Sequence, residues 1–175
     1  VHKIVTAARS LLARKNPSWV RRTIFREIWT RPTLLNLSAG LMRQCQGLGL
    51  FEVGLAGGLL PHGFSLPGRL PRRPARAFLP ETTPAAGKAI TRVGYFLGCS
   101  TNFLYPEIAR STVSVLSRLG CEVVLPGTLK CCGLPHLESG EVEAVGPMAF
   151  DNLAAFRRLG VDTVVSDCAS CSAAI

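Results

Sequence analysis

Long apolar runs are missing from this sequence, and so are several motifs that mark common cofactor sites. No window of 18 consecutive apolar residues occurs, which excludes an obvious membrane-spanning helix. The best candidate, residues 48–60, is too short and contains Glu52. There is no G-x-G-x-x-G fingerprint, no P-loop and no internal repeat, so nucleotide sites of those types are not indicated.

Acidic residues are scarce in the first half of the chain. Residues 1–90 contain 14 Lys or Arg against 3 Asp or Glu, a net charge of +11, whereas residues 91–175 contain 6 against 8, a net charge of −2. A basic half of this kind is typical of a helical surface exposed to solvent, of a segment that contacts an anionic membrane surface, or of one that contacts an acidic subunit. Because its arginines alternate with apolar residues at helical spacing and no recognition module is present, we do not expect nucleic-acid binding.

The cysteine pattern does not indicate a secreted disulfide framework. The chain has seven cysteines, an odd number, and six of them follow residue 98. Cys131 and Cys132 are adjacent, with Cα atoms about 3.8 Å apart, which is too close for a relaxed disulfide. Metal or redox chemistry in a reducing compartment fits this pattern better.

The chain divides into three parts by composition. Residues 1–60 form a basic α-helical segment, in which three helices are predicted before residue 50. Asn16-Pro17 opens the second of these, and Thr30 and Pro32 open the third, whose Leu34, Leu35, Leu41 and Met42 we expect inside. Residues 61–90 form a Pro/Gly/Arg-rich linker. Residues 91–175 form a cysteine-rich domain.

The third part alternates between short apolar runs and helical patterns. Strands are predicted at residues 92–98, 121–126 and 161–167. A helix is predicted at 105–120, with an apolar stripe of Ile108, Val115, Leu116 and Leu119, and another at 138–160, interrupted near Gly146 because Pro147 follows. This order predicts an α/β fold with a small parallel sheet flanked by helices.

Five cysteines follow the ends of these strands. Cys99 follows the first strand, Cys131 and Cys132 follow the second by a short loop, and Cys168 and Cys171 follow the third. Because parallel strands end at the same edge of a sheet, where open α/β sheets bind ligands, we expect the five thiols to converge. Gly133 and Gly98 permit tight turns that bring backbone amides near the sulfurs.

Several ligands suit such a set of thiols. A single zinc ion takes four tetrahedral ligands, so five thiols, two of them adjacent, are one too many. A polynuclear iron–sulfur centre accommodates neighbouring sulfurs on different irons. The ferredoxin run C-x2-C-x2-C-x3-C-P is absent. A thiol–disulfide site at Cys168-x-x-Cys171 and a zinc-stapled interaction module stay open as alternatives.

The complete pattern resembles a known family. It consists of Cys99, then 31 residues, then Cys131-Cys132-Gly133, then 34 residues, then Cys168-Ala169-Ser170-Cys171. This spacing is similar to that of the CCG cysteine-rich domain found in the B-type subunits of heterodisulfide reductase. The residues around these cysteines resemble the iron–sulfur subunits of glycolate oxidase, lactate-utilisation proteins and anaerobic glycerol-3-phosphate dehydrogenase. They are the stretches "GCSTNFLYPEIARSTVSVLSRLGCEVVLP" and "SDCASC".

The resemblance implies an electron-transfer subunit without a flavin of its own. It implies a [4Fe-4S] cluster, non-cubane in one branch of the family, held by Cys99, Cys131, Cys132, Cys168 and Cys171. FAD would lie in a flavoprotein dehydrogenase partner, and electrons would pass toward a quinone or another carrier. A heterodisulfide reductase-like subunit that cleaves a disulfide at the cluster is the alternative.

The resemblance also carries expectations for the rest of the protein. Relatives commonly contain a ferredoxin-like module upstream and a second CCG domain downstream, so we expect this sequence to be a fragment. We expect a cytoplasmic protein, with peripheral contact to the inner face of the membrane through the basic half.

Single residues outside the cysteine set are less telling. His136 is either a hydrogen-bond or proton donor at the cluster or an ordinary polar loop residue. We expect Lys130 to be exposed, Asp167 to cap the helix of Cys168 and Cys171, Cys121 to pack as a small apolar residue, and Cys45 to be structural.

Overall fold

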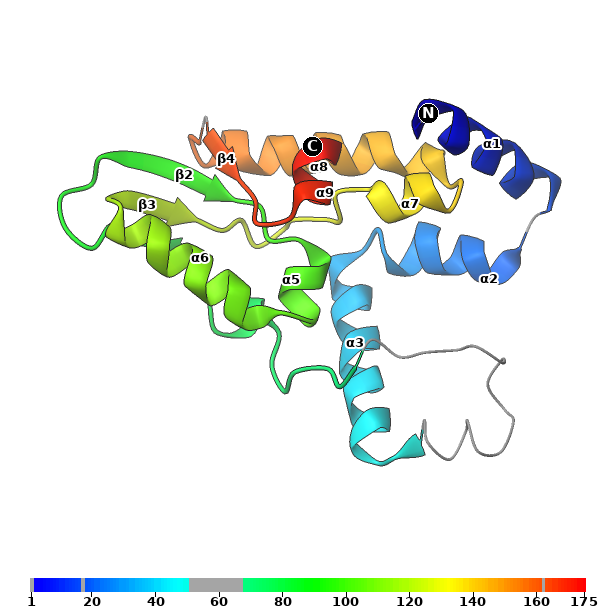
Figure 1. The fold of residues 1–175 in the computed structure, drawn as a ribbon, viewed down its shortest axis with the longest axis horizontal. Helices are drawn as coiled ribbons and strands as arrows, with labels where there is room; N and C mark the ends of the chain where they lie inside the picture. The colour runs from blue at the N-terminus through cyan, green and yellow to red at the C-terminus, as the bar shows by residue number, and fades with distance from the viewer. Residues whose placement is uncertain (1, 17, 51–67, 162) are drawn as a thin grey trace.

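The structure is a computed structural model that describes residues 2–16, 18–50, 68–161 and 163–175. Figure 1 shows helices around one small sheet, which confirms the α/β class. The first part contains the helices α1 (His2–Lys15), α2 (Trp19–Arg22), the π-helix η1 (Thr23–Ile28) and α3 (Pro32–Gly47), and the region predicted as a linker contains the 3-10 helix η2 (Ala75–Ala77). The strands are β1 (Thr82–Thr83), β2 (Thr91–Tyr95), β3 (Cys121–Val124) and β4 (Thr163–Val165). The remaining helices are α5 (Cys99–Phe103), α6 (Pro106–Arg118), α7 (Leu134–Glu138), the 3-10 helix η3 (Val142–Ala144), α8 (Val145–Arg158) and α9 (Ala169–Ala174).

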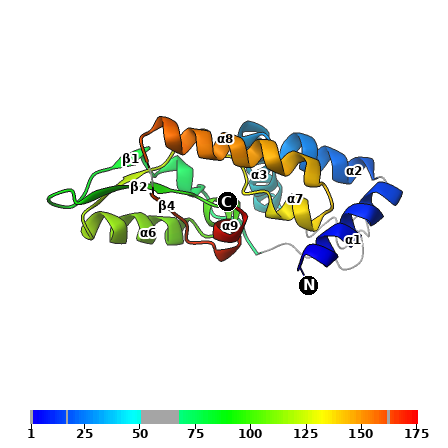
Figure 2. The same ribbon diagram turned by 90° about the horizontal axis from the view of Figure 1, so that it is seen from above.

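The three predicted strands pair in parallel, as expected. The sheet order is β1-β3-β2-β4, and β2 pairs in parallel with both β3 and β4. Val93 of β2 is level with Val123 on one side and Thr163 on the other. Figure 2 shows α8 on one face of the sheet and α6 on the other. β1 is an antiparallel edge strand from the region predicted as a linker.

Helix α8 lies close to the sheet because β2 contains a glycine. A Cβ atom added to Gly94 would lie 2.5 Å from the ring of Phe156 on α8, closer than real Cβ contacts come. The ring of Phe156 lies beside that of Phe96, and both are almost completely buried, as are Tyr95 and Met148. These rings and the apolar strand residues form the core, whose burial is the main favourable contribution to folding.

Helix α6 packs on a different stripe from the predicted one. Its buried residues are Pro106, Ala109 and Val113, with Leu116 packed partly against the core. Ile108, Val115 and Leu119 of the predicted stripe are 49%, 55% and 66% exposed. The helix carries two apolar stripes, and the one with small residues lets the helix axis approach the sheet more closely.

The helices of the first part differ from the prediction in their caps and their packing. Ser18 is the N-cap of α2, so Asn16 is not, and Pro17 lies outside the described residues. Pro32 does open α3, but no residue of α3 is buried, and Leu41 is 61% exposed. Within the described part of the chain, too little packs against α3 to cover the side expected inside.

The helical stretch predicted at 138–160 is in three pieces. Helix α7 ends at Glu138, the chain turns at Ser139–Glu141, and η3 continues directly into α8. The interruption near Gly146 takes the form of this change from 3-10 helix to α-helix at Val145. Pro147 falls in the first turn of α8, where a backbone N–H needs no helical partner, so it breaks nothing.

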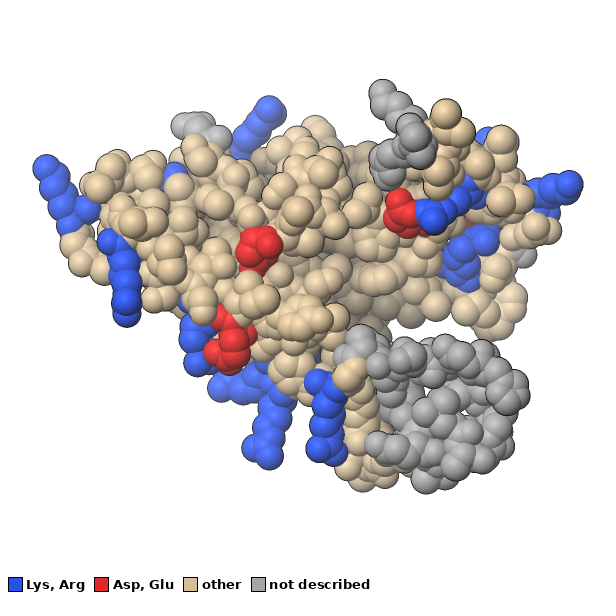
Figure 3. Space-filling model, in the orientation of Figure 1, with Lys and Arg blue, Asp and Glu red and all other residues tan. Residues whose placement is uncertain are grey.

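The basic first part lies against the acidic turn between α7 and α8. Arg9 of α1 pairs with Glu138, and Arg21 and Arg26 both pair with Glu141. Figures 1 and 2 show α1 and α2 beyond α7, at the end of the molecule away from the sheet. In Figure 3 other basic side chains project freely from the viewed face. No helix within the described ranges is both long and apolar enough to cross a membrane.

Candidate metal centre

The five cysteines of the predicted set lie at the carboxyl edge of the parallel strands. Cys99 is the first residue of α5, directly beyond β2. Cys131 and Cys132 lie in the loop between β3 and α7, and Cys168 is the N-cap of α9, which carries Cys171. The parallel pairing of β2 with β3 and β4 therefore brings together residues from three separate stretches of sequence.

The five thiols are neighbours that influence one another's ionisation. The thiol of Cys131 hydrogen-bonds with Cys99 and Cys132. The thiol of Cys171 hydrogen-bonds with Cys132 and Cys168. All five are free thiols, and Cys131, Cys132 and Cys171 are buried. The adjacent pair is thus not a disulfide but the middle of a continuous row of sulfurs.

Interactions among these cysteines give neighbouring thiols very different pKa values. Hydrogen bonds from Cys131 and Cys171, against the effect of burial, lower the pKa of Cys132 to about 3. The hydrogen bond from Cys131 lowers the pKa of Cys99 to about 7. The pKa values of Cys131 and Cys171 are raised, chiefly by their hydrogen bonds to Cys132 and then by burial. These contacts favour the thiolate form of Cys132, the form of cysteine that binds metals.

Backbone amides also face the sulfurs. The N–H of Leu134 hydrogen-bonds with Cys132, and the N–H of Gly133 with Cys131. Gly133 has φ +92°, and a Cβ there would lie 2.8 Å from Val145 Cγ1, so only glycine makes this turn without strain. A Cβ at Gly98 would lie 3.0 Å from the sulfur of Cys171. Gly98 thus makes room for Cys171, whereas the sequence suggested a role beside Cys99.

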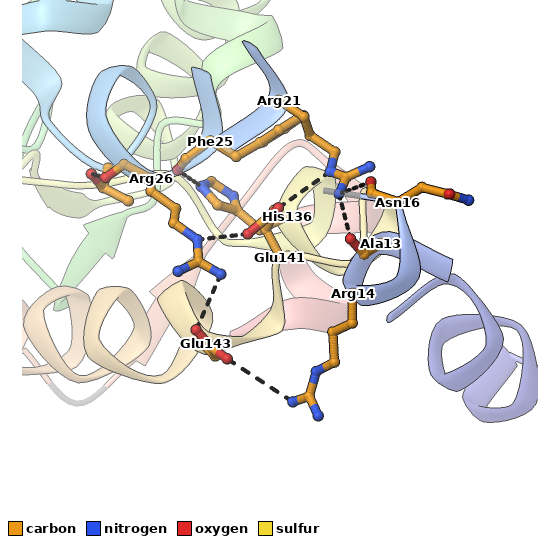
Figure 4. Close-up of polar contacts among 10 residues, drawn as sticks. Ala13, Arg14, Asn16, Arg21, Phe25, Arg26, His136, Glu141 and Glu143 are labelled. Atoms are coloured by element: carbon orange, nitrogen blue, oxygen red, sulfur yellow. Dashed lines mark hydrogen bonds and ion pairs between the residues drawn. The ribbon is translucent and has the colours of Figure 1, made fainter. Parts of the chain in front are cut away.

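His136 is neither an ordinary loop residue nor a partner of a sulfur atom. It is completely buried, and its Nε2 lies 2.8 Å from the carbonyl oxygen of Phe25 in η1. Its ring packs edge-on against Phe25 at 5.3 Å between centroids, beside Trp29. Figure 4 shows His136 pointing from α7 toward the helices of the first part. It is a docking residue between the two halves, and burial lowers its pKa.

Four further residues have definite outcomes. Asp167 does not cap α9; it accepts hydrogen bonds from the hydroxyls of Tyr95 at 2.7 Å and Thr101 at 3.1 Å. This ties the loop before Cys168 to β2 and α5. Lys130 lies partly exposed and pairs with Asp151. Cys121 begins β3 and packs against the core, as predicted, and Cys45 lies half-buried in α3.

Asn152 is a site residue that the sequence reasoning missed. It is 1% exposed, its Oδ1 accepts the N–H of Lys130 at 2.7 Å, and its Nδ2 donates to the carbonyl of Cys131 at 3.3 Å. It fixes the backbone of the cysteine loop to α8. The only signal in the sequence is a polar residue on the buried side of α8, which does not reveal its partner.

An apolar groove reaches the cysteine row from outside. It has a volume of about 240 Å³, lies along α3 and α5, and has Cys99 in its wall beside Trp29, Leu35, Met42 and Phe103. Among the described residues, no three His, Cys, Asp or Glu side chains are grouped to hold a single metal ion. The sulfurs instead follow one another in a row.

The parallel α/β domain thus gathers five thiols at one edge of its sheet. Comparison with known families names it more closely. Residues 93–175 match the family model of the cysteine-rich domain, known as CCG. No solved structure matches the chain.

Curated relatives share this region. The probable glycolate oxidase iron-sulfur subunit of Bacillus subtilis is 29% identical over 161 residues, covering 88% of this chain and 36% of that protein. Lactate utilization protein A of Halalkalibacterium halodurans is 37% identical over 82 residues, 47% of this chain and 33% of that protein. An iron-sulfur protein of Methanococcus maripaludis is 36% identical over 84 residues, 48% of this chain and 17% of that protein. The chain spans about a third or less of these relatives.

Proposed function

We propose that this chain is part of an iron–sulfur electron-transfer subunit of a flavin-dependent oxidoreductase. The observation that carries the proposal is the convergence of five cysteines at the carboxyl edge of the parallel strands. Cys99, Cys131, Cys132, Cys168 and Cys171 would hold the cluster, which we take to be [4Fe-4S]. Two of the relatives are named as iron–sulfur proteins or subunits, which supports this choice of cofactor.

These five cysteines are ligands of the type that an iron–sulfur cluster takes. The set consists of cysteines alone, the pKa of Cys132 among them is lowered, and no carboxylate is among the groups that shift these thiols. When bound, an iron–sulfur cluster accepts and donates single electrons at a potential set by hydrogen bonds to its sulfurs and by exposure to solvent. Here the N–H groups of Leu134 and Gly133 donate to sulfurs, Asn152 fixes their loop, and burial of the sulfurs restricts water.

The partner follows from the relatives. A flavoprotein dehydrogenase that oxidises a 2-hydroxy acid or glycerol phosphate would supply electrons from its FAD, and a quinone or another carrier would receive them. Names such as glycolate oxidase and lactate utilization support the hydroxy-acid branch. A ferredoxin-like module and a second CCG domain would belong to the full-length subunit, because these two relatives are about three times as long as the matched region.

The apolar groove favours a second candidate function. Cys99 lines the groove, so a substrate could approach the row of sulfurs at that residue. A heterodisulfide reductase-like subunit, in which a disulfide is cleaved beside the cluster, needs such access. A zinc-stapled module needs none, and it leaves the fifth thiol without a role.

Anaerobic purification followed by iron, sulfide and zinc analysis tests the proposal. We expect brown protein with iron and sulfide in equal amounts, and loss of most of the iron in the Cys132→Ser variant. Cys45→Ser is the matched control, because Cys45 lies in α3 outside the cysteine row, and it should retain the iron. Colourless protein with stoichiometric zinc contradicts the redox function.

Reduction of the loaded protein in the presence of a disulfide substrate distinguishes the two candidates. Turnover of a disulfide with an artificial electron donor supports the heterodisulfide reductase-like function. Reversible reduction without any turnover supports the carrier.

A further inference from the structure

A second concave site lies at the end of α3, away from the cysteine row. This pocket has a volume of about 400 Å³, and three arginines, Arg43, Arg69 and Arg72, line it together with Gln44 and Gln46. Its lining contains no acidic residue. Figure 3 shows basic side chains projecting side by side below the sheet, beside α3. Arg9, Arg21 and Arg26 pair with glutamates, whereas no ion pair joins Arg43, Arg69 or Arg72 to an acidic residue in the described part of the chain.

Side-chain hydrogen bonds hold the walls of the pocket together. Arg43 Nε donates to the carbonyl of Pro71 at 2.8 Å. Gln46 accepts the N–H of Leu70 at 2.9 Å and donates to the carbonyl of Gly68 at 3.0 Å. These three contacts fasten residues 68–71 to α3, so the arginines of the two segments are presented from a defined frame.

One nitrogen of this frame lacks a partner. Nη2 of Arg43 is buried and makes no hydrogen bond within the described part of the chain. A buried unpaired donor costs about 1–3 kcal/mol, and more when it is charged. An anion in the pocket would relieve the repulsion among the three guanidinium groups.

The end of α3 opposes such an anion only weakly. A helix C-terminus carries about half a negative charge, and two of its carbonyls are already satisfied by the N–H groups of Leu48 and Gly49. Three full positive charges outweigh this partial charge. Arginine is also the side chain whose planar fork matches phosphate oxygens.

We propose that Arg43, Arg69 and Arg72 form a binding site for a phosphate-type oxoanion. A phosphate group fits better than a single carboxylate because it offers enough oxygens and charge for three guanidinium groups. The volume of the pocket leaves room for the organic remainder of a phosphate ester. Either a soluble phosphate ester or the headgroup of an anionic phospholipid has this chemistry.

Calorimetric titration of the whole chain with inorganic phosphate, at constant ionic strength, tests the site. Saturable binding is expected, and the Arg69→Gln/Arg72→Gln variant should weaken it by about tenfold or more. Both arginines are exposed, so their removal leaves the core intact. The matched control is Arg157→Gln/Arg158→Gln on α8, which removes the same charge elsewhere and should bind as the unmodified chain does.

Cosedimentation with vesicles separates the two sources of phosphate. Binding to phosphatidylglycerol vesicles but not to phosphatidylcholine vesicles, lost in Arg69→Gln/Arg72→Gln and kept in the control, assigns a lipid headgroup. Phosphate binding without vesicle binding assigns a soluble ester. Absence of binding to either probe, or equal weakening in both double variants, overturns the proposal. None of these readouts depends on iron in the cysteine row.

Discussion

The carboxylate of Glu141 lies 2.7 Å from Nε of Arg26, and this contact joins the acidic second half of the chain to the basic first half. Glu141 is only 4% exposed, and Arg21 contacts its other oxygen at 3.2 Å. Arg26 also reaches Glu143, so the turn before η3 holds a small ionic network, drawn in Figure 4. The position of the basic helices therefore depends on a few buried charges close to the cysteine loop.

Replacement of this carboxylate should loosen the basic helices. Glu141→Gln leaves two arginines facing a neutral amide, and we expect a loss of about 1–2 kcal/mol in the free energy of unfolding, since both arginines are partly exposed to solvent. Chemical denaturation measures it. Glu107→Gln is the control: Glu107 is 72% exposed in its pair with Arg110, so its loss should cost at most about 0.5 kcal/mol.

Acid should have the same effect as the glutamine variant. Burial raises the pKa of Glu141, but the hydrogen bonds from Arg26 and Arg21 outweigh it and lower the pKa below 4.5. A carboxylate with a lowered native pKa contributes stability above its unfolded pKa and loses it as the pH falls through the native value. Two results would contradict the buried network. One is an equal loss in the free energy of unfolding for Glu141→Gln and Glu107→Gln. The other is that the unmodified chain and Glu141→Gln lose stability to the same extent as the pH falls.

His136 should produce a separate pH dependence closer to neutrality. Burial lowers its native pKa below 6.5, against the raising effects of the Phe25 carbonyl and the charges of Cys132 and Glu141. Below pH 6.5 the unfolded chain binds a proton that the native state resists, so stability should fall with pH by at most about 1.4 kcal/mol per unit. Denaturation at about pH 7.5, 6.5 and 5.5, on either side of the unfolded pKa, measures this slope.

The matched variant for this prediction is His136→Phe. It keeps an aromatic ring against Phe25 and Trp29 but cannot titrate. Its stability should change little between about pH 6.5 and 5.5, where the unmodified histidine titrates in the unfolded chain. A slope equal to that of the unmodified chain would show that another group titrates.

Helix α1 should depend on a glycine in the turn before η3. Gly140 has φ +78°, and an added Cβ would lie 2.7 Å from both the Cβ of Ala13 and the carbonyl oxygen of Arg9. Gly140→Ala should destabilise the chain by about 1–3 kcal/mol and increase amide exchange in α1. Gly146→Ala is the control, because a Cβ there meets nothing within 4 Å, and its effect should lie within about 1 kcal/mol of neutral.

Asn152 should matter for the cysteine loop more than for the core around it. Asn152→Leu keeps the size of the side chain but leaves the N–H of Lys130 and the carbonyl of Cys131 unpaired, which costs about 1–3 kcal/mol. The iron content of the variant should also fall if the loop holds the cluster. Asn36→Leu, at an exposed position on α3, should change neither quantity.

The convergence of the cysteines was predictable because it follows from chain order and strand direction. Parallel strands end at one edge, so Cys99, Cys132 and Cys168 had to approach once the βαβαβ order was recognised. The roles of Gly133 and Cys121 followed from the same local reasoning. Whether the five cysteines bind metal stays a prediction.

Contacts between the halves could not be predicted. Arg26 and Glu141 are 115 residues apart, and the charge asymmetry left open a solvated surface, a membrane surface or an acidic subunit, without revealing that acidic partners lie in the same chain. Asn152 was missed and His136 was given the wrong role for a related reason, since a polar residue in sequence does not show which buried carbonyl it will face. The prediction of which stripe of α6 is buried was wrong. The helix has two apolar faces, and the depth at which it packs against the sheet selected the other one.

Local spacing of apolar residues, glycines and cysteines was thus enough to define the α/β domain and the edge at which its thiols meet, because periodicity and strand direction act over short stretches of chain. The three-dimensional arrangement decided which charges pair, which histidine and asparagine become buried, and which arginines remain grouped around a pocket. Those outcomes depend on contacts between residues far apart in sequence, where desolvation and exact distance determine the free energy.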